Sequence, residues 1–181
     1  MRQLLIGSLK TRLQEGQRQV SQRFLAEGDA ARLLRERCQL IDQVLCDVWR
    51  ELAFPDSLAL IAVGGYGRGE LYPASDIDLL ILLPEAADQA LTTRLEQLVC
   101  TLWDIGLETG HSVRTIEQCL EEAAGDITVQ TAMIEARLLT GSTRLFEGFS
   151  SILQSNLDPR VFFQTKRAEQ DDRHQRFSDT P

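Results

Sequence analysis

Two aspartates, Asp76 and Asp78, stand one residue apart at the start of the apolar run IDLLILL. Side chains of a β-strand alternate between its faces, so a strand beginning here places both carboxylates on one face and Ile77 on the other. Two negative charges beside aliphatic residues repel one another and lose hydration. A divalent cation removes both penalties, and oxygen ligands favour Mg²⁺, with Mn²⁺ as the alternative ion. We therefore predict that Asp76 and Asp78 are catalytic metal ligands of a phosphoryl-transfer site.

A glycine-rich loop leads into this pair. Gly64 and Gly65 directly follow the apolar run LALIAV. Glycine lacks a Cβ, so such a turn adopts positive φ and lets backbone N–H groups approach an anion closely. Arg68 lies in the same loop and can contact phosphate oxygens. We predict that Gly64, Gly65, Arg68 and Ser75, which directly precedes the aspartates, bind a nucleotide through its phosphates.

Each half of this pattern also has an ordinary structural interpretation. A glycine loop between strands is usually a connection, and Asp-x-Asp at a strand start is often turn chemistry. The order strand, Gly-Gly, loop, Asp-x-Asp, strand is more specific than either half. Two other nucleotide-binding patterns are missing from the loop, because it contains neither GxGxxG nor GK[ST].

The surrounding chain alternates helical and strand patterns. We expect helices over residues 2–26, 30–53, 86–105, 126–140, 143–155 and 158–173, and strands over residues 58–63, 77–83 and 107–115. Asp29 is a predicted N-cap, and Thr115 with Gln118 resembles a capping box. These elements predict an α/β (α+β) fold, in which helices flank a small mixed sheet.

Three segments follow from this element order. We predict an N-terminal helical arm over residues 1–56, an α/β core over residues 57–125 and a helical segment over residues 126–181. The end of the chain, RHQRFSDTP, has no closing apolar element, so we expect a fragment of a longer protein.

Composition narrows the class of protein. Of the 181 residues, 43% are hydrophobic, which suits a packed core, and the net charge of -8 argues against a nucleic-acid partner. No apolar stretch is long enough to span a membrane, and the N-terminus lacks a secretion signal, so we expect a cytoplasmic protein. The four cysteines form no CxxC pair, which indicates reduced thiols.

Four aromatic and basic side chains have both a functional and a structural interpretation. Trp49 and Trp103 fall on apolar helix faces, which predicts that both belong to the core. For Tyr66 in the glycine loop, packing is favoured over stacking on a base. For Arg137, an exposed ion pair is favoured over contact with a substrate.

The stretch GGYGRGELYPASDIDLLIL resembles the signature of the DNA polymerase β-like nucleotidyltransferase superfamily. It is most similar to the N-terminal nucleotidyltransferase domain of the bacterial PII uridylyltransferase/uridylyl-removing enzymes. The resemblance continues through LWDIGLETGHSVRT, TAMIEARLLTGSTRLF and RHQRFSDTP, and so covers roughly residues 20 to 181.

This resemblance implies a reaction. UTP binds with Mg²⁺, UMP passes to a tyrosine hydroxyl of the PII nitrogen-signalling protein, and pyrophosphate leaves. The implied roles fall on Gly64 and Gly65 for the triphosphate and on Asp76 and Asp78 for the metal. The family's hydrolytic HD domain and glutamine-sensing ACT domains would lie beyond this chain. Adenylyl transfer to another protein and a non-catalytic nucleotide-binding module stay open as alternatives.

Many members of the superfamily carry a third carboxylate on a later strand. In this chain the corresponding strand is LETGHSVRT, and Glu108 is its nearest acid, on the strand face that also carries Gly110, Ser112 and Arg114. We name Glu108 as the candidate third catalytic carboxylate. The alternative is an ordinary acid at a strand end.

Overall fold

The computed structural model describes residues 2–177. Its elements, in chain order, are α1 (Arg2–Glu27), α2 (Ala30–Glu51), β1 (Ala59–Ala62), α3 (Gly64–Gly67), β2 (Ile77–Leu83), α4 (Gln89–Ile105), β3 (Thr109–Thr115), α5 (Ile116–Gly125), α6 (Ile127–Ile134), β4 (Arg137–Gly141), α7 (Thr143–Ser155) and α8 (Pro159–Phe177). Residues 178–181, the end of the predicted family segment RHQRFSDTP, lie outside the described residues.

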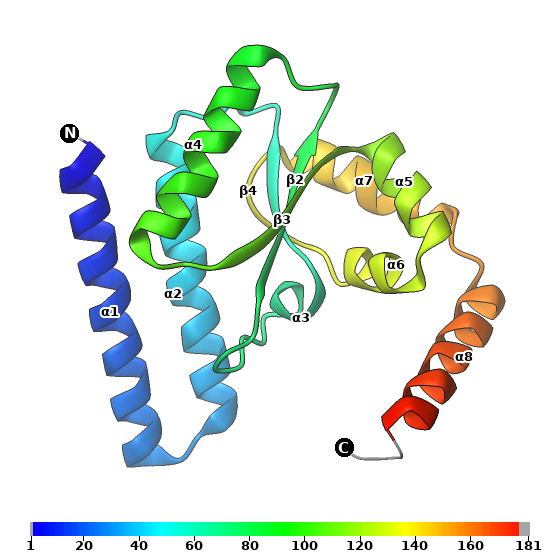
Figure 1. Ribbon diagram of the computed structural model, residues 1–181, viewed down its shortest axis with the longest axis horizontal. Coiled ribbons are helices and arrows are strands. Elements are labelled where there is room, and N and C mark those ends of the chain that lie inside the picture. Colours follow the sequence, from blue (N-terminus) through cyan, green and yellow to red (C-terminus); the bar gives the residue numbers. More distant parts are fainter. Residues whose placement is uncertain (1, 178–181) are drawn as a thin grey trace.

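The four strands form one mixed sheet in the order β3-β2-β1-β4. Strand β1 runs antiparallel to β2 and β4, whereas β2 and β3 are parallel, with Asp78 paired to Gly110. The sheet lies at the centre of the molecule with helices around it (Figure 1). This arrangement confirms the predicted α/β class and the three predicted strands.

Helix ends follow the predicted capping chemistry. The Asp29 carboxylate accepts a hydrogen bond from the backbone N–H of Arg32 at the start of α2, as an N-cap should. Thr115 and Gln118 form a reciprocal capping box that begins α5 directly after β3. The turn from β3 into α5 is therefore fixed by local side chains.

The helix expected over residues 126–140 is wrong in its second half. Helix α6 ends at Ile134, and Arg137–Gly141 forms the edge strand β4 against β1. The local sequence pattern favours a helix, but backbone pairing with β1 makes this segment a strand. The segment is too short for its own sequence to indicate that pairing. Gly141 ends the strand with a φ of 98°, and a Cβ there would lie 2.1 Å from the Leu58 carbonyl oxygen. The sheet thus continues past residue 125, and the division into three segments stays a prediction.

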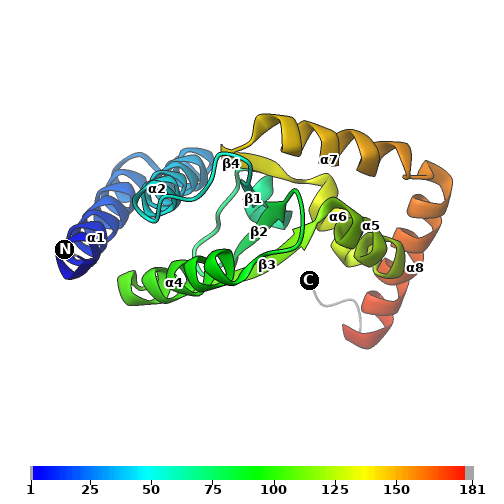
Figure 2. The same cartoon turned by 90° about the horizontal axis from the view of Figure 1, so that it is seen from above.

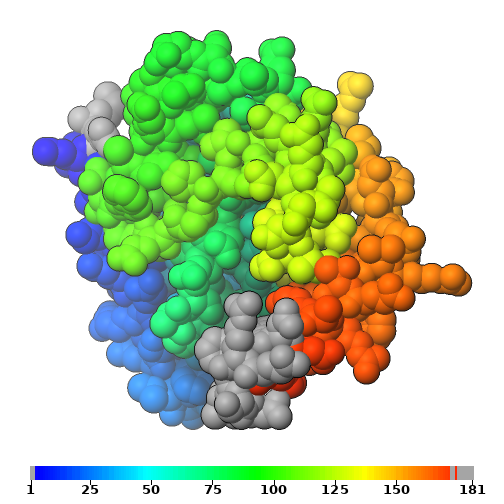
Figure 3. Space-filling model, turned by 45° about the vertical axis from the view of Figure 1, so that its right-hand side comes forward, coloured from blue at the N-terminus to red at the C-terminus, as the bar shows by residue number. Residues whose placement is uncertain are grey.

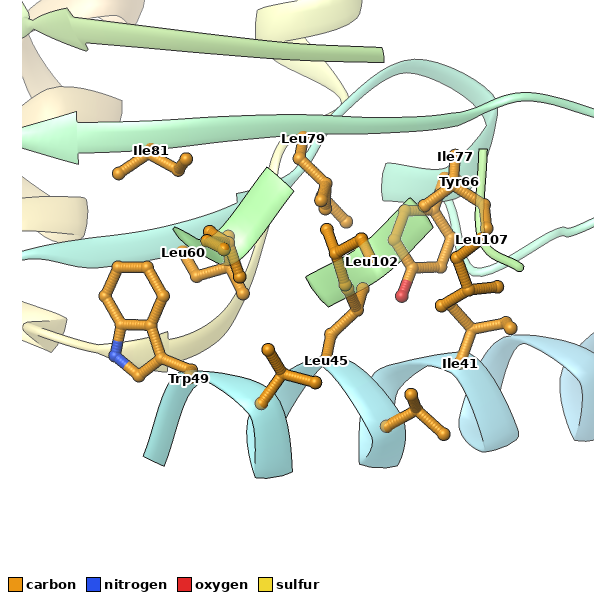
Figure 4. Close-up of a cluster of buried hydrophobic side chains, with 14 of the residues drawn as sticks. Ile41, Leu45, Trp49, Leu60, Tyr66, Ile77, Leu79, Ile81, Leu102 and Leu107 are labelled. Atoms are coloured by element: carbon orange, nitrogen blue, oxygen red, sulfur yellow. The ribbon is translucent and has the colours of Figure 1, made fainter. Parts of the chain in front are cut away.

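Helices cover both faces of the sheet (Figure 2). On one face, α2 and α4 cover the odd-numbered residues of β2, such as Leu79 and Ile81, and α1 packs against these two helices. On the other, α5, α6 and α7 pack against its even-numbered residues Leu80 and Leu82. Figure 4 shows the first core, with α2 side chains pointing toward the sheet. Strand β2 is therefore buried except at Asp78, which is exposed near the start of the strand.

The prediction that both tryptophans are core residues is right for Trp49 and wrong for Trp103. Trp49 is buried and stacks on Phe54, with ring centroids 4.0 Å apart. Trp103 is 65% exposed. It follows the buried Leu102 directly on α4, and one helical step turns a side chain by about 100° away from the packed face.

Among the described residues, no helix combines the length and the apolar character that crossing a membrane requires.

Candidate functional site

The two aspartates lie at the start of β2, where the strand emerges from the core. Both are exposed, whereas Ile77 between them is buried, so the predicted alternation is observed. Partial burial raises the pKa of Asp78, and the negative charge of Asp76 raises it further. Each effect disfavours the ionised carboxylate, and the second places the two carboxylates near enough to repel one another.

The Asp78 carboxylate lies between Gly64, which follows β1, and Gly110, which belongs to β3. These two strands flank β2. On the β1 side, its Oδ2 would lie 3.8 Å from a Cβ built on Gly64. On the β3 side, its Oδ1 would lie only 2.5 Å from a Cβ built on Gly110, closer than real Cβ contacts come. Gly110 therefore leaves the space that this carboxylate occupies.

The glycine loop begins with α3, the single helical turn Gly64–Gly67. Gly64 has a φ of 59°, which confirms that the turn needs the conformational freedom of glycine here. Gly67 is the most tightly packed, because a Cβ there would lie 2.0 Å from the carbonyl oxygen of Glu135. Gly67 carries no signal in the sequence for this role, because its neighbour Glu135 is distant in the chain.

Asp42, Tyr66 and Arg137 form a half-buried polar network that holds α3 in place. Arg137 of β4 donates to both Asp42 carboxylate oxygens, at 2.7 and 3.1 Å, and to the Gly67 and Tyr66 carbonyl oxygens at 3.3 and 3.4 Å. The Tyr66 hydroxyl donates to Asp42 at 2.5 Å. The network joins α2, α3 and β4, so it fixes the glycine turn relative to the sheet.

The network shows which interpretation is right for Tyr66 and which is wrong for Arg137. Tyr66 is 1% exposed, so its favoured interpretation as a packing residue is confirmed and stacking on a base is wrong. Arg137 pairs with Asp42 in a half-buried position, so the expectation of an exposed ion pair is wrong. Glu135 pairs instead with Arg68 at 2.6 Å.

The other predicted phosphate ligands are less closely positioned. Arg68 lies beside Gly65, with its Nη2 3.6 Å from a Cβ built there, but its guanidinium is engaged by Glu135. Ser75 is exposed, and its backbone N–H donates to the Tyr72 carbonyl oxygen at 3.1 Å. A phosphate-binding role for Arg68 and Ser75 therefore stays a prediction.

Two cavities open beside the aspartates. One of about 520 Å³ is lined by Asp76, Trp103, Gly106, Leu107, Glu108, Thr109 and Gly110. A second of about 240 Å³ is lined by Asp78, Ser112 and Arg114 on the sheet and by Val129, Ala132 and Met133 of α6, among others. Figure 3 shows the face on which α6, in yellow, lies near the glycine loop, in green to teal. The site is therefore a groove with the carboxylate pair between two recesses.

The residues present fit a divalent cation held by the aspartate pair. Partial burial and, second, the charge of Asp76 raise the pKa of Asp78, and a bound cation would offset both effects; Gly110 leaves room for the Asp78 carboxylate. Glu108 shares a cavity with Asp76. In the described part of the chain, however, no three His, Cys, Asp or Glu side chains converge to hold a metal, so Glu108 as third carboxylate stays a prediction.

Comparison with known proteins identifies the class of this chain. The family model for the nucleotidyltransferase domain matches residues 45–139, more than half of the chain, including the glycine turn and both aspartates. The chain belongs to the nucleotidyltransferase domain family.

Its curated relatives are more specific. The chain is 49% identical to a bifunctional uridylyltransferase/uridylyl-removing enzyme of Nitrosospira multiformis, over 96% of this chain and 20% of the relative. It is 51% identical to the enzyme of the same name from Burkholderia orbicola, over 88% of this chain and 19% of that one. The chain thus spans about a fifth of the length of these relatives.

Among solved structures, a toxin–antitoxin chain crystallised with AMP-PNP covers 76% of this chain and 95% of its own length, at 20% identity and a TM-score of 0.39.

Proposed function

We propose that this domain transfers UMP from UTP to a tyrosine hydroxyl of the PII signalling protein and releases pyrophosphate, as part of a larger cytoplasmic enzyme. The observation that carries the proposal is 49% identity, over nearly the whole chain, to a relative named for uridylyl transfer and removal. The aspartate pair beside a glycine turn supports the same chemistry from the geometry.

In this proposal, the glycine turn binds the part of the nucleotide that leaves as pyrophosphate. Backbone N–H groups of Gly64 and Gly65 bind the β- and γ-phosphates, since a side chain at either position would keep a phosphate away. Arg68 lies next to Gly65 and adds positive charge, in exchange for part of its contact with Glu135. The hydrogen bonds from Arg137 to the carbonyl oxygens of α3 keep this turn in place during transfer.

The carboxylates act at the phosphorus atom that is attacked. Asp76 and Asp78 would hold Mg²⁺ or Mn²⁺, which supplies positive charge to the α-phosphate and to the carboxylates themselves. The tyrosine oxygen forms a bond to the α-phosphorus, and the bond from that phosphorus to the bridging oxygen of pyrophosphate breaks. Glu108, which lines the cavity beside Asp76, accepts the proton of the tyrosine hydroxyl.

The test is transfer of labelled UMP from UTP to PII by the full-length protein. Replacing the pair, by Asp76→Asn with Asp78→Asn, should reduce transfer by at least about 10³-fold, because charge stabilisation at the phosphorus is lost. Asp56→Asn is the matched control, since Asp56 lies in the turn before β1, at the other end of the sheet. Undiminished transfer by the double variant would refute the assignment of these residues.

The nucleotide is tested separately. Calorimetric titration of the full-length protein with UTP and with ATP, each with Mg²⁺, should show tighter binding of UTP. A preference for ATP would favour adenylyl transfer. Binding of UTP without any release of pyrophosphate in the presence of PII would favour a nucleotide-binding module without catalysis.

A further inference from the structure

Trp103 is a large apolar side chain that the fold leaves at the surface beside the aspartates. It lies near the C-terminal end of α4, which ends at Gly106 with a φ of 86°. Its side chain is 65% exposed, and it lines the cavity of about 520 Å³ that Asp76 and Glu108 also line. Exposed indole rings are uncommon in a monomer's surface and common where an aromatic partner is bound.

The strand order places this cavity opposite the glycine turn. Strand β2, which carries Asp78, has β1 on one side and β3 on the other. The glycine turn follows β1, whereas the cavity is built by the end of α4 and the start of β3. Both sides reach the same carboxylate, since Gly64 lies near Oδ2 of Asp78 and Gly110 lies against its Oδ1.

Phosphoryl transfer proceeds with the entering and leaving oxygens roughly in line on opposite sides of the phosphorus. This step rests on the proposed function, in which pyrophosphate leaves from Gly64 and Gly65. A phosphorus atom at the aspartates then receives the attacking oxygen from the β3 side. The cavity on that side is therefore the approach for the acceptor, and the leaving phosphates lie away from it.

The chemistry of the cavity wall agrees with this direction. The Glu108 carboxylate, which the proposed cation does not engage, can accept a hydrogen bond from a neutral phenol. Thr109 also lines the cavity, and its buried Oγ1 has no hydrogen-bond partner among residues 2–177. The wall thus combines one exposed aromatic face with hydrogen-bonding oxygens, which suits a tyrosine side chain.

We propose that this cavity receives the acceptor tyrosine of PII and that Trp103 packs against its ring. Trp103 is then a specificity-determining residue for the protein acceptor and not for the nucleotide. The aromatic contact holds the ring so that its hydroxyl reaches the phosphorus next to Asp76 and Glu108.

The test uses steady-state uridylylation by the full-length protein, with PII and UTP varied separately. Trp103→Ala should raise the KM for PII about 3- to 10-fold, the range expected for loss of an aromatic pair, and leave the KM for UTP unchanged. Trp103→Phe should restore most of the PII affinity, since it keeps an aromatic ring. Phe163→Ala is the control, because Phe163 on α8 is also 65% exposed.

Two results would overturn the proposal. A rise in the KM for UTP with no change for PII would assign the ring to the nucleobase, and no change in either constant would leave it without a role in binding. Loss of the Phe163 ring should change neither constant. Failure of the proposed function is a distinct outcome, since the unaltered protein would then transfer no UMP to PII at all.

Discussion

The two sides of Asp78 are built in different ways. On the β1 side, α3 is held by hydrogen bonds from Arg137 to its carbonyls, and Gly67 packs directly on the backbone of Glu135. On the β3 side, a cavity of about 520 Å³ adjoins the strand; its wall holds an exposed indole and the Thr109 hydroxyl, which has no hydrogen-bond partner within the described part of the chain. The β1 side is held in position by contacts within the protein, and the β3 side has an open cavity beside it.

This difference suits a transfer reaction in which one substrate is small and the other is a protein. A triphosphate is bound by backbone groups, whose positions must be accurate to a fraction of an ångström. A protein acceptor brings its own structure and needs an accessible recess with a hydrophobic contact. The comparison predicts that substitutions on the β1 side affect the fold strongly, whereas those on the β3 side affect transfer more than stability.

The largest effect is expected from Gly67→Ala. The new Cβ would lie 2.0 Å from the Glu135 carbonyl oxygen and 3.0 Å from that of Ala62, and backbone atoms have little freedom to move. Urea denaturation of the chain should show a loss of about 3 kcal/mol in the free energy of unfolding. Gly148→Ala on α7 is the control, because nothing lies within 4 Å of its Cβ. Equal stability of the two variants would contradict a tightly packed α3.

A smaller loss is expected from Arg137→Leu. This change removes the charged partner of the half-buried Asp42, which keeps the hydrogen bond from the Tyr66 hydroxyl, and removes the Arg137 donor from the Gly67 carbonyl oxygen, so the free energy of unfolding should fall by about 2 kcal/mol. The KM for UTP should rise with it, because the glycine turn is less well held. Arg50→Leu provides the comparison, since its pair with Asp47 is exposed and should matter by less than about 0.5 kcal/mol.

Gly110→Ala separates fold from function on the β3 side. Its Cβ would meet Oδ1 of Asp78 at 2.5 Å, but a carboxylate can rotate away, so stability should fall by less than about 1 kcal/mol. Transfer of UMP should fall about 100-fold, because the carboxylate no longer occupies its position. A loss of stability as large as that of Gly67→Ala would remove the contrast between the two sides.

The smallest effect, of opposite sign, is expected from Asp78→Asn in buffer with a chelator. The pKa of Asp78 is raised in the fold, so the folded chain binds its proton more tightly than the unfolded chain does. Stability contributed by this group is therefore lost as the pH rises from the ordinary aspartate value through the raised one. The variant removes that loss and should melt about 1–2 °C higher than the parent at neutral pH. A lower melting temperature would contradict a fold that disfavours the ionised Asp78 carboxylate through partial burial and the charge of Asp76.

Sequence alone was sufficient for the parts of the site that are local. The turn at Gly64, the alternation of Asp76, Ile77 and Asp78, and the strand that follows depend on backbone conformation and short-range periodicity. The exposed position of Trp103 could also have been found, because the apolar stripe of α4 runs through Leu98 and Leu102 and passes it by.

The remaining features depend on contacts between distant segments. Arg137 and Asp42 are separated by 95 positions, and neither carries a local signal for the other. Strand β4 is five residues long, and it is a strand because its backbone pairs with the edge of β1 that β2 does not occupy. The need for glycine at positions 67 and 110 is visible only in the structure, which places the backbone of Glu135 against Gly67 and the carboxylate of Asp78 against Gly110.

The central claim is that the aspartate pair holds a divalent cation next to a triphosphate bound at the glycine turn. The most direct measurement is anomalous X-ray diffraction from crystals of the full-length protein soaked with Mn²⁺ and a non-hydrolysable UTP analogue. The account predicts a manganese peak in contact with both Asp76 and Asp78, with the β- and γ-phosphates at Gly64 and Gly65. A bound analogue with no metal at these two carboxylates, or with its β- and γ-phosphates in the Trp103 cavity, would contradict it.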